Sequence, residues 1–309
     1  MKANIKKVNL VKQSGGGYAD TSLMEITTKV GCSVNCKYCP QDVFVSNYKG
    51  DCELSYRNFV ECIDKVPEKC SIVFGGFAEA FLNEKCVDMM LYAAKNHCIY
   101  LYTTLVGKGI DLESFETIKK IPIEKCVIHI PDEEGFAHIP ITEEYVKLLN
   151  RIVKSKKKNR QGEVSSFIDH FSCQGHPHHI VVPIIKDYFV LSYLEDRAGN
   201  LENEGCTATE YLTGSLMCRK CGTLLNKNML LPNGDVVLCC NDWGMQHILG
   251  NLLYQTYGEI RAGQALKDVK YKMLMEDDGE VICRKCINAF PLDYIELPSW
   301  QSDMKKMNL

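Results

Sequence analysis

Several common features are missing from this sequence of 309 residues. No apolar run is long enough to cross a bilayer, and the opening residues, MKANIKKVNL, lack the hydrophobic core of a signal peptide. The net charge is only −3, so the composition gives no reason to expect nucleic acid as the main partner. No internal repeat is visible. We therefore expect a cytoplasmic globular protein that binds neither membranes nor nucleic acid.

Cysteine, in contrast, is abundant, with 17 residues. Because the cytosol keeps thiols reduced, a large chain without an export signal is not expected to pair them in disulfides. Tight spacings in such a chain more often mark metal or redox sites, and Cys239 and Cys240 are also adjacent. The scattered cysteines are expected to be small buried hydrophobic residues. The tightly spaced ones are Cys32, Cys36, Cys39, Cys218, Cys221, Cys283 and Cys286.

Strand-like and helix-like patterns alternate over the first two thirds of the chain. The sequence predicts a first strand at 23–30 that runs into a cysteine loop, and the lysines at 154–158 are expected to be a solvated helix end. The alternation predicts βα units around a mostly parallel sheet. Further strand-like runs cover 71–74, 99–104, 126–130 and 180–185, and helical patterns cover 55–66, 84–95, 112–120 and 143–155.

The alternation stops near residue 197. A turn-rich stretch follows, and then residues 228–239 read as a hairpin centred on Pro232-Asn233-Gly234-Asp235. A chain of this length commonly forms one large domain and a smaller one. The change in pattern predicts that the smaller domain is C-terminal.

The first cysteine motif is CxxxCxxC, formed by Cys32, Cys36 and Cys39 directly after the first predicted strand. Thiolates are soft ligands that favour iron–sulfur clusters or zinc. A four-iron cluster held by three protein ligands leaves one iron open for another molecule, whereas a closed site is structural or carries electrons. Three cysteines also suit a zinc site that is completed from elsewhere in the chain.

This loop, with Tyr38 as the aromatic residue before its last cysteine, resembles the signature of radical S-adenosylmethionine (SAM) enzymes. The resemblance implies an α/β fold with a partial (β/α)6 barrel. It also implies a [4Fe–4S] cluster on Cys32, Cys36 and Cys39 whose open iron binds the amino and carboxylate groups of SAM. Reduction of that cluster would yield a 5′-deoxyadenosyl radical that abstracts hydrogen from the substrate. The backbone of Tyr38 would lie against the adenine.

Other SAM contacts follow from the same resemblance. Gly75, Gly76 and Glu79, after the second predicted strand, resemble the glycine-rich segment that contacts the SAM amino group, although two residues are inserted before the glutamate. Thr104 and the threonine before it are at the place of a ribose contact. Arg197 is expected to end the last barrel strand and to reach the SAM carboxylate. A plain turn at the glycines and an exposed structural arginine are the alternatives.

The second cysteine set is Cys221, Cys239, Cys283 and Cys286, arranged as C…GxxxxC…CxxC. It resembles the SPASM/twitch extension of radical SAM enzymes, a small α+β domain. The resemblance implies one auxiliary [4Fe–4S] cluster that is closed by four thiolates, with Cys218 or Cys240 as possible replacements for a neighbour. A structural zinc with the same ligands is the alternative.

Together the resemblances predict the domain organisation and an electron donor. A low-potential donor of the flavodoxin or ferredoxin type is implied for the first cluster. The expected parts are an N-terminal extension at 1–22, a radical SAM partial barrel at 23–205, a SPASM/twitch domain at 206–295 and a C-terminal tail at 296–309.

The leading hypothesis is a radical SAM oxidoreductase that oxidises an alcohol or amine carbon of a carbohydrate or cyclitol. Twitch-type dehydrogenases share this architecture, and the auxiliary cluster would accept an electron. The alternatives are a maturase of ribosomal peptides, which epimerises or crosslinks its substrate, and a non-catalytic electron carrier. Too few residues precede the first strand for a leader-peptide domain, which favours a small substrate. Cys173 and Cys206 are candidate hydrogen donors for an epimerase, and residues 176–179 (HPHH) are candidates for a pocket wall or a base.

Overall fold

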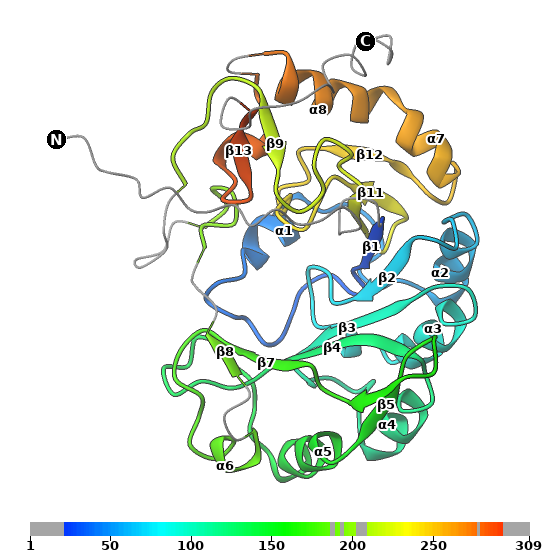
Figure 1. Cartoon of the computed structure of the whole chain (residues 1–309), viewed down its shortest axis with the longest axis vertical. Coiled ribbons are helices and arrows are strands. Elements are labelled where there is room, and N and C mark those ends of the chain that lie inside the picture. Colours follow the sequence, from blue (N-terminus) through cyan, green and yellow to red (C-terminus); the bar gives the residue numbers. More distant parts are fainter. Residues whose placement is uncertain (1–21, 186–188, 192–194, 202–208, 277–278, 293–309) are drawn as a thin grey trace, which may run out of the picture.

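Six parallel strands form the first part of the sheet, as the computed structural model shows (Figure 1). The model describes residues 22–185, 189–191, 195–201, 209–276 and 279–292. Each neighbouring pair is parallel, which confirms the partial (β/α)6 barrel. In spatial order the strands are β1 (Leu23–Ile26), β2 (Ser71–Phe74), β3 (Ile99–Thr103), β4 (Ile123–His129), β7 (His170–Cys173) and β8 (Phe189–Leu191).

Except for the first, the helices between these strands cover the outer face of the sheet (Figure 1). Ser55, Asp111 and Thr142 begin three of them, because each side chain accepts a hydrogen bond from a backbone N–H of the first turn. The predicted helices are thus confirmed: two begin at the predicted residue, and the other ends lie one to three residues inside the predicted ones. The helical segments of this part are α1 (Gln41–Asn47), α2 (Tyr56–Ile63), η1 (Ala80–Leu82), α3 (Cys86–Ala93), α4 (Leu112–Ile118), α5 (Glu143–Val153) and α6 (Val182–Ile185).

Side chains alternate between the two faces of the barrel strands. On β1, Met24 and Ile26 are fully buried in the core, whereas Leu23 and Glu25 line a cavity on the inner face. The inner positions of other strands are also polar, among them Tyr100 of β3 and Lys125 of β4. The outer face therefore supplies the hydrophobic core, and the inner face supplies a polar cavity.

The C-terminal domain continues the barrel sheet. Strand β10 (Lys227–Leu230) pairs in parallel with β1, and β11 (Asp235–Val237) and β12 (Ile248–Asn251) extend the sheet in antiparallel fashion to nine strands. The predicted hairpin at 228–239 is confirmed as β10–β11. The other elements are β9 (Leu216–Cys218), which pairs with β13 (Ala289–Pro291), α7 (Tyr257–Ala262), α8 (Gln264–Leu274) and η2 (Ile282–Lys285).

Two predicted elements are wrong. The run at 180–185 is not a strand, because its last four residues form the short helix α6. The lysine run is not a solvated helix end either, because α5 ends at Val153 and the short strand β5 (Lys156–Lys158) pairs with β6 (Val164–Ser166). Strand alternation turns Lys157 inward, where it is buried and forms an ion pair with Asp169.

No helix in the described part of the chain is both long and apolar enough to cross a membrane.

Candidate active site

One cavity, of about 650 Å³, is bordered by both cysteine motifs. Its walls come from the inner face of β1 to β4, from the loops after those strands and from the C-terminal domain. The predicted site residues that line it are Cys32, Cys36, Tyr38, Cys39, Gly75, Gly76, Glu79, Thr104, Arg197, Cys221, Cys239 and Cys286. The structure therefore gathers most of the predicted SAM and cluster residues in a single space.

The first cysteine loop is folded by its own backbone hydrogen bonds. The N–H of Cys39 donates to the carbonyl of Cys36 at 3.0 Å, and Asn35, with φ +41°, donates to the carbonyl of Cys32 at 3.2 Å. The Cys36 thiol and the Arg197 guanidinium hold the pKa of Cys39 below its usual value. Burial raises the pKa of Cys32, and the Cys39 thiol together with burial raises that of Cys36, so the positive charge favours the thiolate at Cys39 alone.

Tyr38 connects this loop to the barrel. Its buried hydroxyl hydrogen-bonds to Nε2 of His129, the last residue of β4, and the ring centroids are 5.3 Å apart. Its carbonyl accepts a hydrogen bond from Nε of Arg197 at 3.4 Å. Arg197 does not end the last barrel strand as predicted, since β8 ends at Leu191 and Arg197 follows in the loop with φ +50°. The loop nevertheless brings the guanidinium to the cluster motif.

The glycine-rich segment packs against the end of β1. Gly76 has φ +57°, and a Cβ atom there would be 2.5 Å from the carbonyl oxygen of Ile26, so only glycine fits. The carboxylate of Glu79 is buried and accepts hydrogen bonds at 2.7 Å from the hydroxyls of both Thr103 and Thr104. Thr104, predicted at the ribose, thus holds Glu79 in place. Burial raises the pKa of Glu79.

The C-terminal cysteines lie around the hairpin and the end of the domain. The Cys218 and Cys221 thiols hydrogen-bond to each other, and Nδ2 of Asn241 donates to the sulfur of Cys286 at 3.2 Å. Burial raises the pKa of Cys283 to about 12, with Cys286 as the nearest thiol that adds to the shift. Cys240 differs from these thiols, because its nearest charged neighbours are Glu25 and Lys220 of the cavity wall.

Comparisons with known proteins agree with this arrangement. A family model for SPASM, an iron–sulfur cluster-binding domain, matches residues 218–287. The fold is similar to that of BtrN in complex with AdoMet and 2-DOIA, with a TM-score of 0.56 at 14% identity over 88% of this chain and 94% of that chain. The chain therefore carries a SPASM domain in its C-terminal part and shares the fold of BtrN. Streptococcus suis SuiB bound to precursor peptide SuiA is also similar, with a TM-score of 0.51 at 15% identity over 80% of this chain and 66% of that chain.

No curated protein matches the sequence.

The donor set of this chain fits [4Fe–4S] clusters, because thiolates are the soft ligands that such clusters take. Three cysteines of each set line the same cavity. Cys32, Cys36 and Cys39 would hold the first cluster, and Cys221, Cys239, Cys283 and Cys286 would hold the auxiliary one.

The cavity also has unsatisfied polar atoms that suit a polar ligand such as SAM. In the described part of the chain, Nε1 of Trp243 and Oε1 of Gln41 are buried without a hydrogen-bond partner. Both residues line the cavity close to Cys39. Because buried polar atoms normally have partners, a bound molecule is expected to provide them.

The other residues that the sequence suggested as hydrogen donor, base or pocket wall do not line the cavity in the described part of the chain. Cys173 is fully buried and does not line it, and Cys206 lies outside the described residues. The histidines of the 176–179 segment do not line the cavity either. Nδ1 of His176 pairs with Glu134 at 2.5 Å, and Nδ1 of His179 pairs with Glu133 at 2.9 Å. With side-chain exposures of 88% and 72%, these two histidines do not form a pocket wall.

Sequence reasoning missed several residues of the inner wall. Lys125 and His129 of β4 and Lys220 of the SPASM domain line the cavity. The period of two in β4 could have indicated the first two, because Cys126 and Ile128 between them are apolar. Lys220 stands in a turn without a periodic pattern, so its place depends on the tertiary fold.

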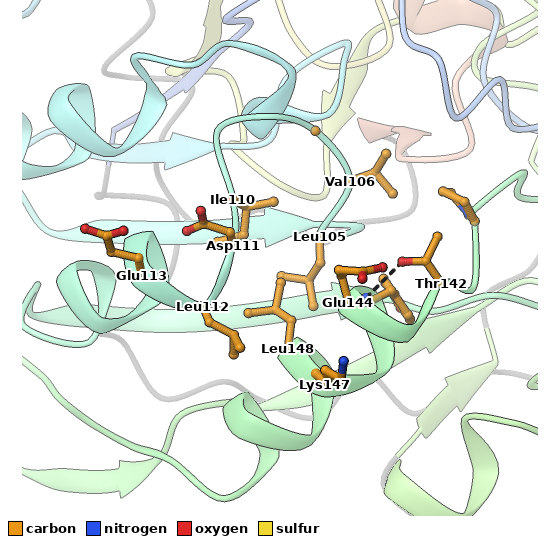
Figure 2. Close-up of a pocket in the computed structure, with 13 residues that line it drawn as sticks. Leu105, Val106, Ile110, Asp111, Leu112, Glu113, Thr142, Glu144, Lys147 and Leu148 are labelled. Atoms are coloured by element: carbon orange, nitrogen blue, oxygen red, sulfur yellow. Dashed lines mark hydrogen bonds between the residues drawn. The ribbon is translucent and has the colours of Figure 1, made fainter.

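A second cavity, of about 460 Å³, lies between the loop after β3 and α5 (Figure 2). Leu105, Ile110 and Leu148 make its wall mostly apolar. It contains no cysteine and none of the predicted site residues, so we do not assign it to the active site.

Proposed function

We propose that this chain is a radical SAM oxidoreductase that removes hydrogen from a substrate carbon bearing a hydroxyl or amine, on a carbohydrate or cyclitol. The observation that carries the proposal is the single cavity bordered by both cysteine motifs. When bound, the first cluster and SAM supply a 5′-deoxyadenosyl radical, and the auxiliary cluster supplies an acceptor for one electron. BtrN, the small-molecule complex among the similar structures, is matched over 94% of its length, which supports a small substrate.

The chain's own residues meet the other needs of such an oxidation. Oxidising an alcohol to a ketone transfers one hydrogen atom to the radical, one electron to an acceptor and one proton to a base. Burial lowers the pKa of His129 to about 4, so the imidazole is neutral at physiological pH and, with Tyr38, forms a hydrogen-bonded pair on the wall. The Glu79 cradle and Arg197 provide a carboxylate and a guanidinium for the SAM amino acid group.

SAM cleavage tests this proposal. The reconstituted protein is reduced anaerobically by dithionite, or by a low-potential flavodoxin, and 5′-deoxyadenosine and methionine are quantified. We expect both products in equal amounts from the wild type and none from a Cys36→Ala variant. If the wild type forms no 5′-deoxyadenosine, even with cell extract as a source of substrate, the electron-carrier alternative replaces the proposed activity.

A second reaction, epimerisation, is favoured by one observation. Cys240 lines the cavity beside Arg197, Glu25 and Lys220, and the GxxxxC spacing assigns cluster ligation to Cys239 instead. A thiol in this place could return a hydrogen atom to a substrate radical. Cys173 could not, because it does not line the cavity. SuiB in complex with its precursor peptide keeps a peptide substrate within this proposal.

Isotope labelling separates the two reactions. In D₂O, an epimerase leaves one deuterium on the product carbon, whereas a dehydrogenase leaves none. For an epimerase, Cys240→Ser abolishes product formation but keeps the iron content and SAM cleavage, while Cys173→Ser behaves as the wild type. Full activity of Cys240→Ser rules out this thiol as the hydrogen donor.

A further inference from the structure

The charged residues of the active-site cavity are unevenly matched. Its wall contains more lysine and arginine side chains than carboxylates, although a charge in a walled cavity is unfavourable unless it is paired. Each charge therefore needs either a protein partner or a ligand. The cationic residues are Lys125, Arg197, Lys220 and Lys227, and the carboxylates are Glu25 and Glu79.

All but one of these charges have a charged or hydrogen-bonding partner in the protein. Glu79 accepts hydrogen bonds from the two threonines of β3, and Arg197 donates to the carbonyl of Tyr38. Lys220 faces Cys240 and Glu25, and Glu25 in turn faces Lys227. Lys220 is thus directed to the cysteines of the auxiliary site.

Lys125 is the exception. It is half-buried in the middle of β4, on the same face as His129, and the residue that pairs with it on β3 is Tyr100. Two strands separate β4 from β1, so Glu25 is roughly 14 Å away along the sheet. Within the described ranges, Lys125 forms no ion pair. Its Nζ lies over the face of the Tyr102 ring, 6.0 Å from the ring centroid.

We propose that Lys125 binds an anionic group of the substrate, so that the substrate is a sugar or cyclitol carrying a carboxylate or a phosphate. This inference depends on the proposed function. Lys125 lines the same cavity as both cysteine motifs, so a substrate anchored at its ammonium ion would lie in the space that those motifs border. Tyr100, Tyr102 and Ser172 of the same wall carry hydroxyls that suit a polyol.

Equilibrium dialysis tests this assignment with three labelled probes: D-glucose, D-glucuronate and D-glucose 6-phosphate. The reconstituted holoenzyme, with SAM present, is expected to bind at least one anionic probe about tenfold more tightly than glucose, because only an anionic probe can pair its charge with the Lys125 ammonium ion. Which anionic probe binds better distinguishes carboxylate from phosphate. Lys125→Met should abolish the preference, and Lys125→Arg should keep it.

The matched control is Lys85→Met. Lys85 is a solvent-exposed lysine that pairs with Asp88 at 3.5 Å, so its substitution should leave the preference unchanged. Equal binding of all three probes, binding of none, or an undiminished preference in Lys125→Met would overturn the assignment. The same samples are assayed for 5′-deoxyadenosine. An anion preference without SAM cleavage contradicts the proposed function alone, and SAM cleavage without the preference contradicts only the role of Lys125.

Discussion

Arg284 is expected to hold the auxiliary site together. It stands inside the CxxC motif, between Cys283 and Cys286, and its side chain is fully buried. The guanidinium donates to five backbone carbonyls at 2.5–3.0 Å, and no carboxylate pairs with it in the described part of the chain. The side chain therefore joins the end of α8 to the segment before β9. The accepting carbonyls belong to Leu212, Gly214, Lys272, Glu276 and Gly279.

Replacement of Arg284 by methionine keeps the apolar stem but leaves these carbonyls without a donor. Hydrogen bonds of a charged group contribute about 1.5–3 kcal/mol each. Because the loops can relax and admit water, we expect a total loss of about 3–5 kcal/mol in the free energy of unfolding of this domain.

Anaerobic urea titration measures this loss. A Cys32/Cys36/Cys39→Ala background leaves only the auxiliary cluster to absorb, and its bleaching reports the unfolding of the domain. With an m-value of roughly 2 kcal/mol per molar urea, the midpoint should fall by about 2 M in Arg284→Met. The exposed neighbour Lys285 provides the control variant, Lys285→Met, which should unfold with the parent. An unchanged midpoint in Arg284→Met would show that these hydrogen bonds do not stabilise the domain.

Three further predictions concern the barrel. Gly76→Ala should lower the free energy of unfolding by about 2–4 kcal/mol, because φ is +57° and the carbonyl oxygen of Ile26 would be 2.5 Å from the new Cβ. Gly75→Ala is the control and should cost less, because its nearest atom would be 3.2 Å away. Thermal melts of both variants measure the difference. Lys157→Met should cost about 1–2 kcal/mol in urea unfolding, because it removes the ion pair with Asp169, whose side chain is still 36% exposed to water; a loss below about 0.5 kcal/mol would contradict a stabilising pair. Burial lowers the pKa of His129 from 6.5 to about 4, so the unfolded chain takes up this proton first and stability should fall as the pH drops from 6.5 to 4; urea midpoints of His129→Phe should fall less over that interval.

Much of the fold could be predicted because its signals are local. The strand-like run of β2 is predicted at 71–74, and the observed strand has the same bounds. The Pro-Asn-Gly-Asp turn identified the β10–β11 hairpin. The four outer helices followed from their spacing, and Ser55 and Thr142 mark the starts of two.

The failures involve residues whose environment is set by distant parts of the chain. Three of the four residues of α6 are β-branched, but Pro183 disfavours a strand, and a helix this short depends on its packing against α5 more than on propensity. Lys157 looked like any solvated lysine until β5 paired with β6 and turned it toward Asp169.

The active site divides in the same way. Cysteine spacing and the glycine-rich segment indicated the cluster and SAM residues without knowledge of the fold. Lys125 and His129, in contrast, become site residues only because the strands curve around one cavity. Sequence spacing thus indicates the cofactors, while the inner faces of the strands carry the information about the substrate.

We expect this chain to hold an open cluster and a closed auxiliary cluster on two separate cysteine sets. Anaerobic reconstitution followed by iron, sulfide and zinc analysis measures both clusters, on the wild type and on Cys32/Cys36/Cys39→Ala. We expect about eight irons per chain in the wild type and about four in the variant, with four-iron spectra in both. About four irons in the wild type, with zinc retained in the variant, would contradict the auxiliary cluster and the electron-accepting role assigned to it.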